Sequence, residues 1–128
     1  MVTINEEQLD IIKHYYELVE VVDEALQYLS SDRFNEDGKV EQKVMQDSLM
    51  AISKIMEANE HLKRIFSNVP DKVQTFDQFE SFLEELDRLN DVFDISVLRK
   101  ETLQRHVAPA FEAWKMGVEK QLIKYIVH

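Results

Sequence analysis

Residues 5–30 read NEEQLDIIKHYYELVEVVDEALQYLS, and this stretch predicts a long helix. Asn5 and Gln8 have the spacing of a capping box, in which the side chain of each residue binds the backbone N–H of the other. Apolar residues then recur at steps of three and four, which keeps them on one helical face: Leu9, Ile12, Tyr16, Val19, Val22, Leu26 and Leu29. We therefore expect a helix from about Glu6 to about Ser30 that buries this face.

Loop signals on either side define a second helix. The segment 31–38 is polar and ends in the turn dipeptide Asp37-Gly38. The apolar periodicity returns from about Lys39 to about Ser67, and its inward positions are Val44, Ser48, Ile52, Ile55, Met56, Asn59, Leu62 and Phe66. Pro70 disfavours helical geometry at the residue before it, so we expect the second helix to end before this proline.

Two further helical segments are expected after Pro70. Thr75 and Gln78 repeat the capping-box spacing and predict a helix that ends near Phe93. Asp94 or Ser96 then caps a last helical stretch, whose apolar stripe is Phe111, Trp114, Val118, Leu122, Tyr125 and Ile126. Pro109 lies inside this stretch, and we expect it to kink or break the helix.

These segments predict an all-α protein with a single domain over residues 1–128. Its architecture is an antiparallel four-helix bundle, or a five-helix bundle if Pro109 makes a true corner. Apolar residues make up 45% of a cysteine-free chain, which is enough for one core without disulfides. No apolar run reaches the roughly 20 residues that span a bilayer, and no secretion signal is visible, so we expect a cytoplasmic protein without a membrane partner.

The charge balance narrows the choice of partners. The chain has 25 acidic residues against 15 lysines and arginines, for a formal net charge of −10. Nucleic-acid affinity rests largely on basic residues that displace counterions, so direct nucleic-acid binding is disfavoured. The acidity either keeps the domain soluble or matches a basic partner.

The C-terminal stretch Val107-Ala-Pro-Ala-Phe-Glu-Ala-Trp114, followed by Glu119, Leu122 and Tyr125-Ile126, resembles a family of short, acidic, all-helical proteins of Gram-positive bacteria without an assigned function. The resemblance covers about the last 25 residues. It implies a helical fold and a bacterial setting, and no catalytic or binding residue. Small acidic helical proteins also resemble, by class alone, flagellar or secretion chaperones that hold an amphipathic client segment.

The helix expected to end near Phe93 has a wide apolar arc. Its members spread over more than the roughly 100° that a one-sided surface helix requires: Phe76, Phe79, Phe82, Leu83, Leu86, Leu89, Val92 and Phe93. Either the last helix packs around this one, or a protein partner or second copy covers Phe76, Phe79 and Phe82. We take these three residues as the candidate partner-binding site of a non-enzymatic interaction module, adaptor or chaperone-like.

One catalytic pattern provides the alternative function. Glu57 and Glu60, followed by Glu84 and Asp87, have the spacing with which all-helical nucleotide pyrophosphohydrolases of the MazG type hold magnesium against a triphosphate. On a 100° projection, Glu57 and Glu84 point away from the apolar faces of their helices, which argues against a shared metal site. The magnesium-dependent hydrolase remains the alternative hypothesis.

The histidines predict no metal site or cofactor site of their own. They are dispersed along the chain as His14, His61, His106 and His128, and no Glu-x-x-His motif of a di-iron bundle occurs. Asp10 precedes His14 by one turn and Glu57 precedes His61 by one turn, a spacing typical of surface hydrogen bonds. We therefore expect no catalytic residue and no cofactor.

Overall fold

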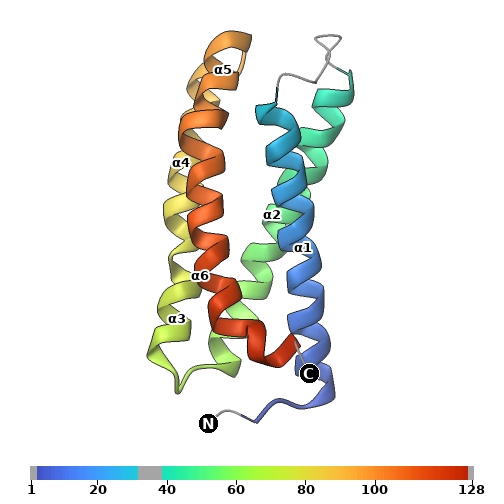
Figure 1. Cartoon of the computed structure of the whole chain (residues 1–128), viewed down its shortest axis with the longest axis vertical. Helices are drawn as coiled ribbons and strands as arrows, with labels where there is room; N and C mark the ends of the chain where they lie inside the picture. Colours follow the sequence, from blue (N-terminus) through green and yellow to red (C-terminus); the bar gives the residue numbers. More distant parts are fainter. Residues whose placement is uncertain (1–2, 32–38, 127–128) are drawn as a thin grey trace.

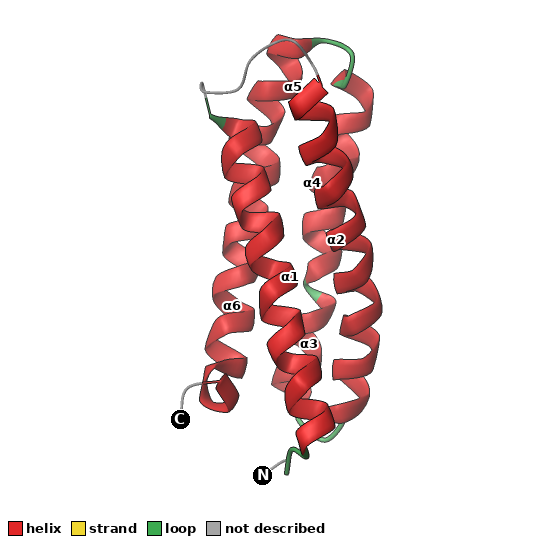
Figure 2. Ribbon diagram, turned by 90° about the vertical axis from the view of Figure 1, so that its right-hand side faces the viewer, coloured by secondary structure: helices red, strands yellow, loops and turns green. Residues whose placement is uncertain are grey.

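The computed structural model describes residues 3–31 and 39–126, and within these ranges it contains helices and no strand. The elements in chain order are α1 (Glu6–Ser30), α2 (Lys39–Ile65), α3 (Pro70–Asp77), α4 (Phe79–Val92), α5 (Ser96–Thr102), a π-helical turn η1 (Leu103–Val107) and α6 (Ala108–Ile126). The helices α3 and α4 run end to end, and so do α5, η1 and α6. The described chain therefore forms four antiparallel rods (Figures 1 and 2). The predicted all-α bundle is confirmed.

The first helix has the predicted bounds and the predicted cap. The Gln8 backbone N–H donates to Asn5 Oδ1 at 2.8 Å, and the Asn5 N–H donates to Gln8 Oε1 at 3.1 Å. These two backbone N–H groups, which have no partner within the helix, are thereby hydrogen-bonded, as the capping-box spacing predicts. The loop predicted over residues 31–38 falls almost entirely outside the described residues.

The second rod begins at Lys39 as predicted and ends two residues early, at Ile65. A tight turn follows, in which the Val69 N–H donates to the Phe66 carbonyl at 2.8 Å. Pro70 then begins the next helix instead of merely stopping the previous one. A proline costs nothing at the first helical position, because its missing N–H would have no helical partner there.

The predicted cap at Thr75 is wrong. Thr75 lies inside α3, where its hydroxyl donates to the Asp71 carbonyl one turn back at 2.9 Å. Its own carbonyl accepts a hydrogen bond of 3.2 Å from the Trp114 indole N–H of α6. Gln78 separates α3 from α4, so the break lies three residues after the predicted cap at Thr75.

The last rod is continuous from Ser96 to Ile126. Ile95 occupies its N-cap position and no side chain caps the helix, so the caps predicted at Asp94 and Ser96 are wrong. Pro109 is preceded by the turn η1, after which the Ala108 N–H donates to the carbonyl of Leu103 five residues back. The wider π-turn relieves the clash that a proline ring makes with an α-helical carbonyl, so the rod turns no corner.

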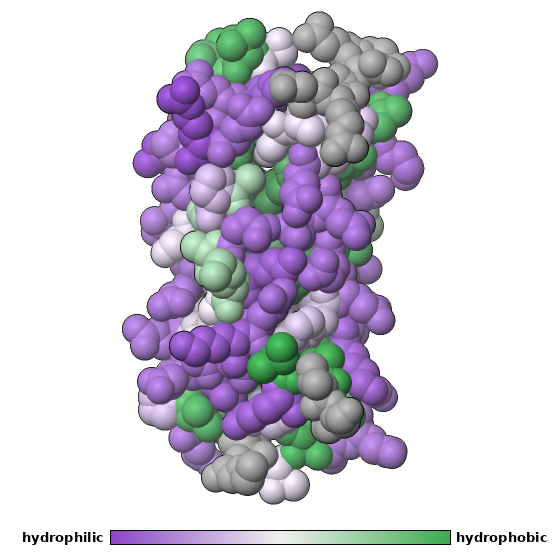
Figure 3. Space-filling view, viewed as in Figure 1, coloured by the Kyte–Doolittle hydropathy of each residue, from purple (hydrophilic) through white to green (hydrophobic). Residues whose placement is uncertain are grey.

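Side chains from all four rods form one core. Fully buried rings include Tyr15 of α1, Phe66 at the end of α2, Phe82 of α4 and Phe111 of α6. Tyr15 was not in the predicted stripe, whereas Tyr16, which was, is half-buried. The exterior is mainly hydrophilic in the view of Figure 3. Within the described ranges, no helix is both long and apolar enough to cross a membrane.

A candidate partner-binding groove between α1 and α2

The aromatic residues predicted to bind a partner are core residues. Phe76, Phe79 and Phe82 are 2%, 2% and 0% exposed. The Phe79 ring centroid lies 4.5 Å from that of Trp114, and the Phe82 centroid lies 5.1 Å from that of Phe111. The last helix therefore covers the wide apolar arc, and the assignment of these three residues as a partner-binding site is wrong.

The acidic quartet does not come together. Glu57, Glu60, Glu84 and Asp87 are all exposed. The hollow of about 290 Å³ beside Glu57 and Glu60 reaches only the first turn of α4, at Phe79 and Glu80. Nowhere in residues 3–31 and 39–126 are three or more His, Cys, Asp or Glu residues placed to hold a metal ion. The hydrolase hypothesis thus lacks the shared metal site on which it rests.

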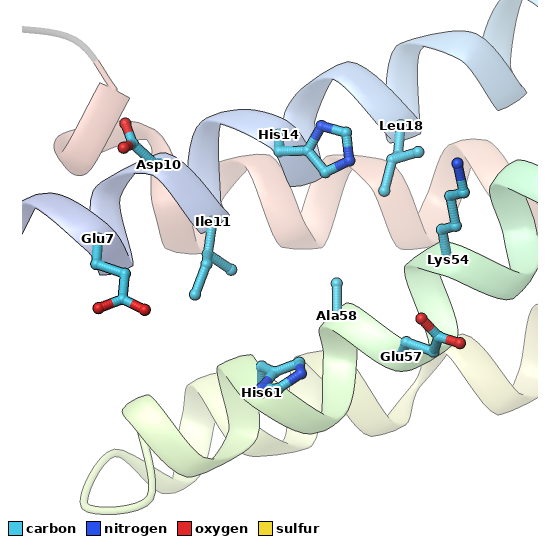
Figure 4. Close-up of a pocket in the computed structure, with 9 residues that line it drawn as sticks. All are labelled: Glu7, Asp10, Ile11, His14, Leu18, Lys54, Glu57, Ala58 and His61. Carbon is cyan, nitrogen blue, oxygen red and sulfur yellow. The ribbon is translucent and has the colours of Figure 1, made fainter.

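A different feature, a groove of about 500 Å³, lies between α1 and α2 (Figure 4). We call it the α1/α2 groove and define it by the nine residues that line it. Its floor is apolar and consists of Ile11, Leu18 and Ala58. Its rim is polar, with Glu7, Asp10 and His14 on α1, and Lys54, Glu57 and His61 on α2. A concave apolar floor with a few polar groups around it is the usual composition of a binding site.

The floor exists because α1 has a second apolar stripe beside its core stripe. Ile11, Leu18 and Ala25 follow one another at steps of seven, and Val21 and Tyr28 do the same along the adjoining line. Steps of seven keep residues on one face of a helix, about 20° out of line per step. This heptad pattern was the signal in the sequence, and it was missed because the core stripe accounts for the helix by itself.

The charged groups of the rim are largely free to bind a ligand. Glu7, Asp10 and Glu57 form no ion pair with any described residue, and neither does Lys54. His14 is the exception, since its Nδ1 lies 3.6 Å from Glu17 Oε2 on the same helix. Unpaired charges beside an apolar floor indicate a surface suited to a partner that carries both apolar and charged groups.

A second hollow of about 280 Å³ continues the same face of the helix pair. It is lined only by residues of α1 and α2, namely Val21, Glu24, Ala25, Tyr28, Val44, Asp47 and Ser48. Apart from Asp10 and Glu24, the α1 residues of the two hollows alternate in steps of four and three from Glu7 to Tyr28, so both hollows lie along one line. Figure 1 shows α1 and α2 together on one side of the bundle, with α4, α5 and α6 on the other side.

A partly buried charge network lies elsewhere, between α1 and α6, and holds these helices together. Lys115 Nζ lies 2.8 Å from Asp23 Oδ2 and 3.0 Å from Glu20 Oε1. Burial by itself lowers the pKa of Lys115, but the hydrogen bonds that it donates to Asp23 and Glu20 outweigh this effect and raise the pKa. A hydrogen bond with Asp23, together with burial, raises the pKa of Glu112 to about 7. The network satisfies its own charges, so we assign it a structural role.

Comparison with curated proteins found no match, and comparison with solved structures found none either. One family, described as a domain of unknown function (DUF8042), matches residues 10–117. This match runs from α1 into α6 and includes every residue of both hollows except Glu7. The chain therefore belongs to the DUF8042 family.

Proposed function

We propose that the protein is a non-enzymatic interaction module, adaptor or chaperone-like, which binds a helical segment of another protein in the α1/α2 groove. The observation that carries the proposal is the combination of an apolar floor with an unpaired charged rim between two antiparallel helices. Recognition of an amphipathic helix in a groove uses these two features together, because its apolar face fills the floor and its polar flanks meet the rim.

The shape of the site supports a helix as the occupant. The groove and the second hollow follow α1 from Glu7 to Tyr28, a length on the order of 30 Å at 1.5 Å per residue. A small metabolite would use only one of the two hollows, whereas a helix laid along the α1 and α2 axes contacts both. The partly buried Ile11 and Ala58 would lose their remaining solvent contact in such a complex.

A second copy of the same chain is the less favoured occupant. A two-fold dimer through this face would bring its acidic rim against an identical acidic rim, because such an interface places the same patch on both subunits. Glu7, Asp10 and Glu57 outnumber the single Lys54 on the rim, and the whole chain has a net charge of −10. Repulsion between like charges would therefore oppose this dimer.

Site-specific photo-crosslinking in the native host tests the proposal. A photo-reactive amino acid at His61, on the rim of the groove, should form an adduct of defined mass with a partner protein. The same amino acid at Lys120, an exposed position on α6, should not form this adduct. Ala58→Arg should fill the groove and abolish the adduct, while Ala113→Arg, at an exposed alanine of α6, should leave it unchanged.

The outcomes separate the candidate functions clearly. An adduct twice the mass of the chain would identify a homodimer instead of a separate partner. Adducts that form equally from both positions, or that survive Ala58→Arg, would show that the groove is not the binding site. The absence of any adduct from the groove position would contradict the proposal.

A further inference from the structure

The charges that line the two hollows are strongly biased toward one sign. Five carboxylates line them, namely Glu7, Asp10, Glu24, Asp47 and Glu57, against one lysine, Lys54. Asp47 pairs with Lys43 at 3.7 Å, in an ion pair whose side chains are both well exposed. The other four carboxylates have no ion pair with a described residue, so they present uncompensated negative charge beside the apolar floor.

The distance between the two hollows sets a second requirement, which is the length that an occupant of both must span. Along α2, the buried Ala51 lies between the residues that line the two hollows. The midpoints of the two sets of lining residues are about 12 residues apart along α1 and about 11 along α2, or roughly 17–18 Å at 1.5 Å per residue. A partner helix parallel to α1 and α2 spans the same distance in about 11 residues, which is three turns.

From these two observations we infer that the occupant is a basic amphipathic helix with two apolar anchors about 11 residues apart and with lysine or arginine beside each anchor. This inference rests on the proposed function and specifies its partner. One anchor enters the α1/α2 groove over Ile11 and Ala58, and the other enters the second hollow over Ala25 and Val44. The basic flanks pair with the four unpaired carboxylates, which makes association dependent on salt.

Three synthetic helical peptides of about 22 residues test the inference, with affinity measured by fluorescence anisotropy on the full chain. The first has leucine anchors 11 residues apart with lysine flanks. The second has the same anchors with glutamate flanks, and the third keeps the lysine flanks but has its anchors seven residues apart. We expect the first peptide to bind at least tenfold more tightly than either of the others, and to lose several-fold in affinity between 50 and 300 mM salt.

Two matched double variants show where the peptide binds. Asp10→Lys with Glu57→Lys reverses two carboxylates of the groove, and we expect it to weaken the first peptide at least tenfold. Glu84→Lys with Asp87→Lys makes the same change in net charge at exposed positions of α4 and should alter affinity less than twofold. All four positions are exposed, so the variants should keep the fold, which helical circular dichroism checks.

Each of the remaining outcomes overturns a stated part of the inference. Equal binding of the lysine and glutamate peptides would show that charge does not select the partner. Equal binding of the two lysine peptides would overturn the anchor spacing, and equal weakening by both double variants would show nonspecific attraction to an acidic protein. If no peptide binds while the photo-crosslink still forms in the groove, the partner chemistry is wrong and the proposed function stands. If both fail, the groove is not a binding site.

Discussion

Replacement of Glu112 by glutamine should stabilise the protein at pH 8 and change its stability much less at pH 5. A hydrogen bond with Asp23, together with burial and the charge of Asp23, raises the pKa of Glu112 from 4.5 to about 7. Between these two values the folded state holds a proton that the unfolded state releases, so the wild-type stability should rise as the pH falls from 8 toward 5. Glutamine carries no charge at any pH and still has an N–H donor for the Asp23 carboxylate. It therefore removes the free-energy cost of an ionised carboxylate beside Asp23 in the folded state at pH 8.

The size of this effect follows from the pKa shift and from solvent screening. A rise from 4.5 to about 7 corresponds to roughly 3 kcal/mol if nothing screened the charge. Glu112 is an exposed residue, so screening should reduce the effect to about 1 kcal/mol, or on the order of 4 °C in melting temperature. Asp23 does not disturb the measurement: burial alone would raise its pKa, but its hydrogen bonds with Glu112 and Lys115 lower it. The stability that Asp23 contributes is therefore present above its unfolded pKa and is lost only below the range tested.

The assay is urea unfolding followed by circular dichroism at pH 5, 6, 7 and 8. Glu84→Gln is the matched control, because it makes the same chemical change at an exposed position of α4. The control should follow the wild-type pH dependence, while Glu112→Gln should give a flatter curve. A variant that is less stable than wild type at pH 8, or that keeps the full wild-type slope, would refute the proton-sharing interpretation of the Asp23–Glu112 contact.

Three further results are expected. Phe82→Ala should cost about 3–5 kcal/mol of unfolding free energy, because the Phe82 ring is fully buried. Phe93→Ala should cost far less, because the Phe93 ring is 39% exposed. Urea unfolding of both variants measures this difference. Arg99 Nε lies 3.0 Å from Glu41 Oε1 in a largely buried ion pair. Arg99→Met should cost about 3 kcal/mol of unfolding free energy, because it leaves the Glu41 carboxylate without this partner. The double variant Arg99→Met with Glu41→Met should recover much of that loss, as urea unfolding can measure. Magnesium with nucleoside triphosphates should not raise the melting temperature, because the acidic quartet does not converge; a clear shift would revive the hydrolase hypothesis.

Local signals in the sequence predicted the long helices well. The cap of α1 is formed by Asn5 and Gln8, which are three residues apart, so the local sequence contains the whole capping interaction. The similar spacing of Thr75 and Gln78 led to a wrong prediction of a helix cap, because the carbonyl of Thr75 accepts a hydrogen bond from Trp114, 39 residues away. No local pattern contains that contact. The helix start at Pro70 is a local signal, because proline is favoured at the first helical position, but the prediction used this proline only as a stop.

The site was harder to predict than the fold. The wide apolar arc around Phe79 correctly required cover on two sides, but its width does not tell whether a second protein or α6 provides that cover. The α1/α2 groove depends on how two antiparallel helices are rotated against each other, which brings Ile11 of one beside Ala58 of the other. The heptad stripe in the sequence shows which residues of α1 line the groove. Which residues of α2 lie opposite them is known only from the packed bundle.

The π-helical turn at Leu103–Val107 has a consequence for the history of this fold. A π-turn corresponds to one residue more than an α-helix needs for the same length, so it marks a place where a single residue can be gained or lost without breaking the rod. Loss of one residue here would convert the π-turn into a regular α-helical turn and would leave Phe111 and Trp114 facing the core. Related chains that are one residue shorter within this turn should therefore keep the apolar stripe of their last helix on the same face.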